Sequence, residues 1–207
     1  MEQRSPEWHA ARLGKVTASR VADLMARTKS GYSASRANYM AELVCERLTG
    51  TPTERFSNAA MQWGTDQEPA AKAAYSFMMD AEIVEEGFVL HPGIKDFGAS
   101  PDGLIGADGL VEIKCPNTAT HIETLRTDTI DGKYLIQMQS QMACTGRAWC
   151  DFVSFDPRLP PEMQLFVKRV HRDHGRIAEI ETEIGTFLIE LNLTVEDLNR
   201  RYRSEAA

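Results

Sequence analysis

Several patterns that identify common protein classes are missing from this 207-residue sequence. The five histidines show no ligand spacing, and there is no glycine-rich phosphate loop, so neither a serine hydrolase nor an NTPase is supported. The cysteines form no C-x-x-C pair, which excludes the usual zinc site. We expect them to be small buried side chains in a reducing compartment. They are Cys45, Cys115, Cys144 and Cys150.

Long hydrophobic runs are also missing. No apolar stretch approaches the length of a membrane span, and the first residues lack a hydrophobic signal segment. We therefore expect a cytoplasmic protein with no membrane partner. Apolar residues at 43% and charged residues at 26% are ordinary for a globular chain. Residues 1–207 are expected to form one domain whose core needs neither disulfides nor a structural metal.

Acidic side chains outnumber basic ones, and the net charge is −7 at pH 7. A net negative charge argues mildly against a nucleic-acid partner. The charge is unevenly spread, however. The first 36 residues carry seven basic side chains against three acidic ones. A protein that binds and then releases DNA needs a positively charged surface where the DNA lies, but it does not need a positive net charge. The composition therefore leaves a DNA partner open.

The strongest functional signal lies in residues 100–104 (Ser-Pro-Asp-Gly-Leu) and 110–114 (Leu-Val-Glu-Ile-Lys). Successive side chains on a strand point to opposite faces, so Glu112 and Lys114 share one face and Val111 and Ile113 the other. Charged side chains on a buried strand are costly unless a charged group meets them. A divalent metal and a phosphodiester would do so, because carboxylates hold the ion and the lysine orients the attacking water or stabilises developing charge. The pattern predicts a metal-dependent nuclease core.

The hairpin between these segments decides whether Asp102 joins the site. If the connection covers residues 105–109, Asp102 lies opposite Glu112, with β-carbons about 5 Å apart. A connection one residue shorter places Asp102 opposite Ile113, on the wrong face. Pro-Asp-Gly is also a common turn. The same acid-x-Lys pattern recurs at residues 131–133 without an apolar strand around it, so the pattern alone is weak.

Further residues can complete such a site. Glu68 is a candidate third carboxylate, with a solvated helix carboxylate as the alternative. The main-chain carbonyl of Ile113 is another candidate ligand, because hard cations accept backbone oxygen. Arg12 and Ser19 flank a glycine break and a new helix start, which is either an anion-binding arrangement or a capped helix with a surface arginine. Gln137 is either solvated or faces the cleft and donates to a phosphate.

The order of predicted elements is helices, then strands with an inserted helix, then helices. This order predicts an α/β protein with a mixed central sheet and a helical N-terminal flank. Pro69 is expected to kink or split its helix, and Thr194 to cap a separate last helix. The expected helices cover residues 5–14, 17–26, 33–48, 58–79, 131–144 and 173–191, with the last one starting at 194. The expected strands cover residues 83–91, 97–99, the hairpin around 104 and 111, 148–155 and 164–171.

Matches to one known family run in order through most of the chain. They are Glu7-Trp8-His9, Arg12-Leu13-Gly14 with Thr17-Ala18-Ser19, Trp63-Gly64 with Glu68, Ser100-Pro101-Asp102-Gly103, Glu112-Ile113-Lys114-Cys115-Pro116, Tyr134 with Gln137 and Gln139, and Asp156-Pro157-Arg158. On these residues the sequence resembles the phage lambda exonuclease family, the YqaJ-type viral recombinases of the PD-(D/E)xK nuclease superfamily. The resemblance implies a restriction-endonuclease-like fold.

The resemblance also implies an activity. Such an enzyme degrades one strand of duplex DNA from a 5′-phosphorylated end with two Mg²⁺ ions per site (Mn²⁺ is possible), and leaves a 3′ overhang for a single-strand annealing protein. It forms a homotrimeric ring and is phage-encoded. By similarity, Asp102, Glu112 and Glu68 serve the metals and Lys114 the nucleophile. The remaining matches are Arg12, Ser19, Ser100 and Gln137 at the 5′-phosphate, Met61 as an apolar wedge between the strands and Lys29 in a DNA groove.

Two alternatives remain at this point. One is an endonuclease of restriction or repair type with the same chemistry. The other is a non-catalytic DNA-binding or annealing module on the same fold, against which the intact set of Asp102, Glu112 and Lys114 argues.

Overall fold

A computed structural model of the protein describes residues 2–53 and 59–203. Within them the helices are α1 (Pro6–Arg12), α2 (Val21–Met25), α3 (Ala34–Thr49), α4 (Ala59–Met79), α5 (Thr118–Thr127), α6 (Gly132–Thr145) and α7 (His174–Arg203), with 3-10 turns η1 (Ala18–Arg20) and η2 (Pro161–Met163). The strands are β1 (Val16–Thr17), β2 (Arg27–Thr28), β3 (Gly31–Tyr32), β4 (Ile83–Val84), β5 (Val89–Leu90), β6 (Phe97–Ala99), β7 (Gly103–Ile105), β8 (Gly109–Lys114), β9 (Trp149–Phe155) and β10 (Leu165–His171).

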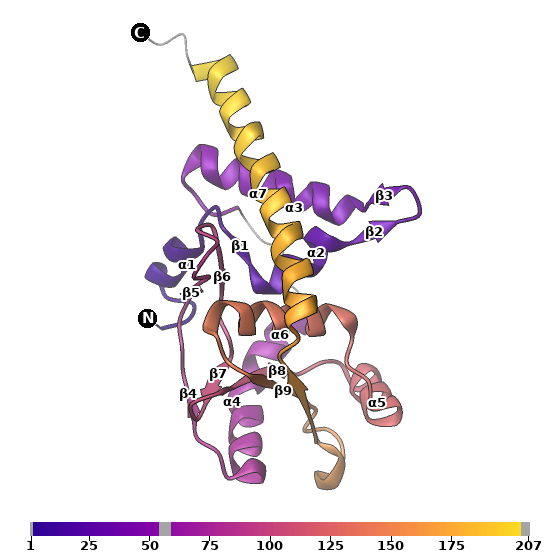
Figure 1. Ribbon diagram of the computed structural model, residues 1–207. Coiled ribbons are helices and arrows are strands. Elements are labelled where there is room, and N and C mark those ends of the chain that lie inside the picture. The colour runs from indigo at the N-terminus through magenta and orange to yellow at the C-terminus, as the bar shows by residue number, and fades with distance from the viewer. Residues whose placement is uncertain (1, 54–58, 204–207) are drawn as a thin grey trace.

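The central sheet has the strand order β10-β9-β8-β7-β4. Strands β8 and β9 run parallel and the other neighbours antiparallel, which confirms the predicted mixed sheet. Val111 and Ile113 of β8 belong to an apolar cluster with Tyr75 of α4. Leu110, from the other face of β8, clusters with Met138 of α6. Helices α4 and α6 therefore cover opposite faces of the sheet (Figure 1).

The N-terminal helices form a second layer against α7. A core cluster joins buried side chains of α2, α3 and α7, and the ring of Tyr39 stacks on that of Phe187 with 5.6 Å between centroids. A small sheet of order β1-β6-β5 lies beside this layer, and its strands β1 and β6 are parallel. This arrangement confirms the predicted helical N-terminal flank (Figure 1).

Local signals explain where several helices begin and end. The Ser5 hydroxyl accepts a hydrogen bond from the backbone N–H of Trp8, as expected of an N-cap. Asp131 caps α6 by accepting from the N–H of Lys133. Gly50 ends α3 with φ +69°, a left-handed conformation that glycine adopts without strain.

Three expectations were wrong, and the one for Pro69 was wrong in part. Residues 83–91 form two strands in different sheets, because β4 pairs with β7 and β5 pairs with β6. Helix α7 continues through Thr194, whose hydroxyl donates to the Glu190 carbonyl at 2.8 Å instead of capping a new helix. Pro69 was expected to kink or split its helix, and α4 continues through it, so the split does not occur. Cys45 is exposed, whereas the other three cysteines are buried.

Other elements were only partly anticipated. The helix expected over residues 17–26 begins as strand β1 and turn η1 before α2 starts. Helix α5 and the β2–β3 hairpin were not predicted at all. Residue 58, the expected start of α4, lies outside the described residues. No helix in the described part of the chain has the length and apolar character needed to cross a membrane.

Candidate active site

The β7–β8 hairpin has the register that the nuclease interpretation requires. Gly103 pairs with Val111 and Leu104 with Leu110, so the same register places Asp102 opposite Glu112. The Asp102 carboxylate accepts a 2.7 Å hydrogen bond from the backbone N–H of Ile113, which fixes it at the end of the hairpin. Asp102 and Glu112 therefore lie opposite each other on neighbouring segments in the middle of the central sheet.

Asp102 is surrounded by negative charge. The loss of hydration at its carboxylate and the charge of Glu112 raise the pKa of Asp102 to about 7, and the charge of Lys114 acts in the opposite direction. Glu68 adds to the increase. Of the charged groups that act on Asp102, Glu112 and Glu68 raise its pKa and Lys114 lowers it, so a bound cation would favour the ionised carboxylate.

Glu112 has no exposed surface, and protein donors hold both of its oxygens. Gln137 donates to Oε1 at 2.7 Å and Gln141 to Oε2 at 2.5 Å, both from α6. Lys114 forms an ion pair with Oε1. These donors offset the cost of burying the carboxylate and hold it in one orientation.

Lys114 is protonated in this environment. Burial lowers the pKa of Lys114, but the charges of Glu112 and Asp102 outweigh that effect and raise the pKa above its ordinary value. Its ammonium also lies 5.2 Å from the ring centroid of Tyr134. A charged ammonium at this position can orient a water molecule or stabilise negative charge on a phosphate.

Glu68 reaches the same cleft from α4. It is held by two cations, with Arg4 at 2.8 Å from Oε2 and Lys72 at 3.1 Å from Oε1. The cleft has a volume of about 530 Å³, and its walls include Glu68, Asp102 and Lys114. Ile113 and Met61 also line it, so the structure brings together these five residues that the sequence singled out.

The chemical type of the available donors, which are oxygen atoms, suits a hard divalent cation. Carboxylates of Asp102, Glu112 and Glu68 and the backbone of Ile113 offer oxygen, and a bound cation would favour the ionised form of Asp102. Within residues 2–53 and 59–203, however, no three His, Cys, Asp or Glu side chains are grouped closely enough to hold an ion. The carboxylates are paired with protein cations and amides, so an ion must replace some of those partners.

The predicted anion site lies at the end of the small sheet. The Arg12 guanidinium lies 3.4 Å from the Ser100 hydroxyl and 3.8 Å from the ring centroid of Trp8. Trp8 itself donates its indole N–H to that hydroxyl at 2.9 Å. Ser19 lies in turn η1 after β1, and Ser100 directly follows β6, the parallel neighbour of β1, so both serines lie beyond the carboxyl ends of paired strands. The printed contacts bring Arg12 and Ser100 together, and Ser19 lies at the same end of the small sheet.

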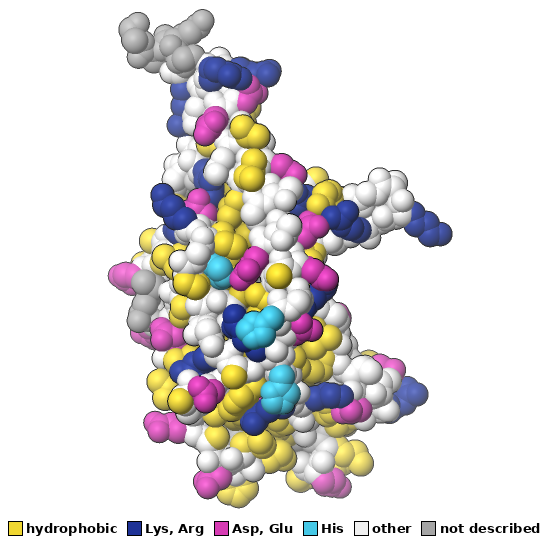
Figure 2. Space-filling view, viewed as in Figure 1, with side chains coloured by type: hydrophobic (Ala, Val, Ile, Leu, Met, Phe, Trp, Pro, Cys, Tyr) yellow, Lys and Arg dark blue, Asp and Glu magenta, His cyan; other side chains and the backbone are white. Residues whose placement is uncertain are grey.

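The structure places Gln137 beside Glu112 and Lys29 on the β2–β3 hairpin. The Gln137 amide is bonded to Glu112, so it supports the carboxylate pair. Lys29 lies at the exposed tip of the β2–β3 hairpin, which projects from the body of the protein (Figure 1), and basic side chains are visible on this projection (Figure 2). The projection is accessible to a large partner.

Three residues at the site had been given no role from the sequence. Gln141 lies one helical turn after Gln137 on the same face of α6, and Trp8 one turn before Arg12, so i, i+4 spacing to a candidate residue is the signal that could have identified both. No local signal points to Arg4, because its position depends on contacts with distant segments.

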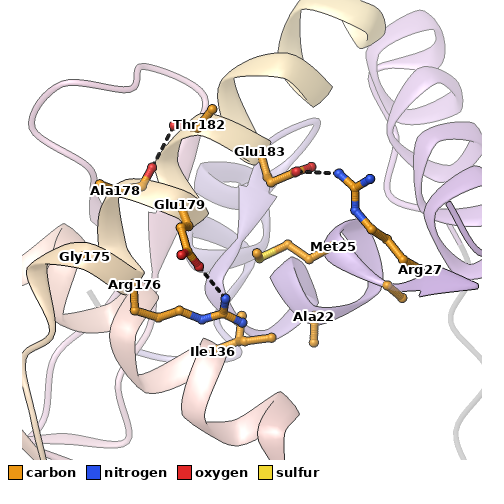
Figure 3. A pocket seen from close by; sticks show the side chains of 11 residues that line it. Ala22, Met25, Arg27, Ile136, Gly175, Arg176, Ala178, Glu179, Thr182 and Glu183 are labelled. Atoms are coloured by element: carbon orange, nitrogen blue, oxygen red, sulfur yellow. Dashed lines mark hydrogen bonds and ion pairs between the residues drawn. The ribbon is translucent and has the colours of Figure 1, made fainter. Parts of the chain in front are cut away.

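A larger groove of about 690 Å³ lies elsewhere, between α2 and α7 (Figure 3). Its charged side chains pair with one another, since Arg27 lies 2.6 Å from Glu183 and Arg176 lies 2.6 Å from Glu179. Each of its carboxylates is paired with an arginine, whereas two further carboxylates act on Asp102, so the size of the groove does not make it the active site.

Residues 7–148 match the sequence profile of the YqaJ-like viral recombinase domain, which covers more than half of the chain. The chain belongs to this family. A protein of the mimivirus of Acanthamoeba polyphaga is 25% identical to this family member over 168 residues, which is 73% of this chain but only 29% of the viral protein.

Solved structures agree with the assignment to the family. The alkaline exonuclease LHK-Exo of Laribacter hongkongensis, also solved in complex with dAMP, is 58% identical with a TM-score of 0.91, and the match covers 98% of this chain and all of that one. A phage-related exonuclease of Haemophilus somnus has a TM-score of 0.72 at 14% identity over 89% of this chain and 96% of its own, which shows a shared fold. The predicted lambda-exonuclease type of fold is confirmed.

Proposed function

We propose that the protein is a metal-dependent exonuclease that degrades one strand of duplex DNA from a 5′-phosphorylated end and leaves a 3′ overhang for recombination by strand annealing. The observation that carries this proposal is the hairpin register, which places Asp102 opposite Glu112 with Lys114 on the same face. A relative with 58% identity that is named an exonuclease and was solved with a mononucleotide supports the same reaction class.

The chemistry follows from the residues of the cleft. A divalent cation held by Asp102 and Glu112, with Glu68 and the Ile113 carbonyl as further oxygen donors, would polarise the phosphate and lower the pKa of the attacking water. Lys114 remains charged and stabilises the negative charge that develops on the phosphate. Gln137 and Gln141 keep Glu112 in place while its partners change.

The anion site explains why the enzyme would act at an end. Ser100 precedes Asp102 by two residues, so their backbones lie at most about 7 Å apart. A terminal phosphate bound by Arg12, Ser19 and Ser100 would therefore hold the first nucleotides against the catalytic carboxylates. Met61, which is 59% exposed beside the cleft, is suited to separating the strands, and Lys29 to contacting the duplex.

The family resemblance supports the finer features of the proposal. We infer two Mg²⁺ ions per site, with Mn²⁺ as a substitute, a ring-shaped homotrimer and a single-strand annealing protein as partner. The inferred setting is the cytoplasm of a bacterial host that carries a phage or prophage. Light scattering of the purified protein tests the trimer, since a monomeric mass under native conditions contradicts it.

The decisive experiment digests an end-labelled linear duplex with Mg²⁺ and with EDTA. We expect the 5′ label to be released early as a mononucleotide, and only with Mg²⁺. Early release of a 3′ label would contradict the proposed 5′→3′ polarity. Lys114→Ala is expected to lower the cleavage rate at least about a hundredfold while end binding is retained. A variant that digests DNA at the wild-type rate contradicts the assigned role of Lys114.

The endonuclease alternative predicts a different result with blocked ends. A duplex whose 5′ ends are covalently blocked is expected to resist the exonuclease, whereas an endonuclease still cuts it. A non-catalytic module would bind the unblocked duplex but release no nucleotide with either Mg²⁺ or Mn²⁺.

A further inference from the structure

Arg4 reaches the catalytic cleft from a segment that precedes α1. Its backbone has φ +68°, a left-handed conformation that residues other than glycine rarely adopt. Its guanidinium lies 2.8 Å from Oε2 of Glu68, and Arg4 lines the same cleft as Asp102 and Lys114. An uncommon backbone conformation therefore places a positive charge among the catalytic carboxylates.

The neighbouring Gln3 holds this segment in place. Its side-chain amide donates to the carbonyl of Glu86 at 2.8 Å and to that of Pro101 at 2.7 Å. Pro101 directly precedes Asp102, so the anchor is attached to the catalytic hairpin itself. These two hydrogen bonds offset the strain at Arg4.

The cations of the cleft differ in how firmly they are held. Lys114 projects from the central sheet, and its side chain is 26% exposed. Lys72 lies one turn after Glu68 on α4 and is 22% exposed. Arg4 is 56% exposed and belongs to no helix or strand, so it is the cation that can leave the cleft with the least rearrangement.

We propose that Arg4 is a built-in counter-cation of the cleft, which neutralises Glu68 in the metal-free protein and competes with the divalent cation for that carboxylate. Arg4 is thus a positioning residue that sets the metal affinity. The inference rests on the proposed function, because it requires Glu68 to become a metal ligand.

The test measures Mn²⁺ binding to the untagged full chain from the electron paramagnetic resonance signal of the free ion. Arg4→Gln is expected to bind Mn²⁺ about three- to tenfold more tightly than the wild type, because a competing charge is removed. Arg4→Lys retains the charge and is expected to bind almost as the wild type does. Arg126→Gln is the matched control, since its 2.7 Å pair with Glu123 is exposed on α5. It is expected to leave binding unchanged.

A second variant and a second measurement separate competition from a structural effect. Gln3→Ala releases the anchor without changing any charge, and it is expected to tighten Mn²⁺ binding in the same direction as Arg4→Gln. In EDTA, Arg4→Gln is expected to melt at a lower temperature than the wild type, and saturating Mn²⁺ is expected to remove that difference. Binding by Arg4→Gln that equals or is weaker than that of the wild type contradicts the role of Arg4.

Asp102→Asn distinguishes failure of this inference from failure of the proposed function. If the wild type binds Mn²⁺ no better than Asp102→Asn, the metal site itself is wrong and the inference is overturned with it. If Asp102→Asn abolishes binding while Arg4→Gln leaves it unchanged, the metal site stands and only the role of Arg4 is refuted.

Discussion

Gln141 donates its side-chain amide to Oε2 of Glu112 at 2.5 Å, and neither residue is exposed to solvent. A buried carboxylate that loses one of its donors retains the full cost of its burial. The glutamines of α6 therefore hold a buried carboxylate of the candidate active site in place.

Replacing Gln141 with leucine is expected to lower both stability and activity. The lost donor lowers the free energy of unfolding by about 1–3 kcal/mol. Cleavage is expected to be slower, because the carboxylate of Glu112 is no longer held in one orientation. Gln139→Leu is the comparison, because Gln139 is also buried but bonds the carbonyl of His171 and the N–H of Asp173. Urea unfolding should show destabilisation in both variants, and exonuclease assays a specific defect in Gln141→Leu. Similar cleavage rates per folded molecule would show that Gln141 is merely structural.

Arg12→Ala is expected to weaken the preference for 5′-phosphorylated over 5′-hydroxyl ends. A charged hydrogen bond to phosphate contributes about 1.5–3 kcal/mol, so the preference should fall by about 10- to 100-fold. The ratio of initial rates on the two ends measures this. Arg176→Ala, in the groove of Figure 3, removes the same charge far from Ser100 and should leave the ratio unchanged. Equal loss on both substrates would remove Arg12 from the phosphate site.

The pair of Asp156 and Arg158 is expected to make stability fall in acid. Burial raises the pKa of Asp156, but hydrogen bonds from Arg158 and Thr118 outweigh it and lower the pKa to about 2. Because the pKa of Asp156 is lower in the folded protein than in the unfolded chain, its ionised form stabilises the fold at any pH above 3.8. This stabilisation is lost as the pH falls from 3.8 toward 2. The contribution is about 2 kcal/mol.

Urea unfolding of the wild type and of Asp156→Asn between pH 6 and pH 2 tests this expectation. The wild type should lose about 2 kcal/mol more than the variant over this range, because asparagine cannot be protonated there. Parallel pH profiles for the two proteins would show that the pair does not stabilise the fold.

Gly103→Ala is expected to disturb the catalytic hairpin. A β-carbon at Gly103 would lie 2.2 Å from Cγ2 of Ile83 and 3.2 Å from Cγ1 of Val111. The overlap is expected to cost about 1–3 kcal/mol of unfolding free energy and to move the adjacent Asp102. Ile83→Ala should restore part of the loss in the double variant. Gly132→Ala, which meets nothing within 4 Å, should be neutral. Additive losses from Gly103→Ala and Ile83→Ala would exclude the clash.

The elements that followed from sequence depend on neighbours in the chain. The alternation of β8 predicted that Glu112 and Lys114 share a face, because strand geometry fixes which way successive side chains point. Ser5 and Gly50 predicted the ends of α1 and α3 through bonds and dihedral angles within a few residues. The residue pattern also indicated the candidate carboxylates and the anion arrangement of Arg12 and Ser19, and the family resemblance added Ser100, Met61 and Lys29.

The errors arose where distant contacts decided the outcome. Apolar residues from 83 to 91 suggested one strand, but the chain leaves the sheet of β7 for that of β6 between Val84 and Val89. Thr194 resembled an N-cap, yet buried side chains of α7 against α2 and α3 favour one continuous helix. A local pattern cannot distinguish these cases, because the competing partners lie far away in sequence.

By itself, the sequence determined the chemical identities of Asp102, Glu112 and Lys114, the face that Glu112 and Lys114 share, and the family to which the chain belongs. Only the tertiary structure decided the hairpin register that sets Asp102 opposite Glu112, the donation of Gln141 and the presence of Arg4 beside Glu68. The reason is physical. A side chain's type and face are local properties of the backbone, whereas its partner is whichever distant group packing brings within about 3 Å.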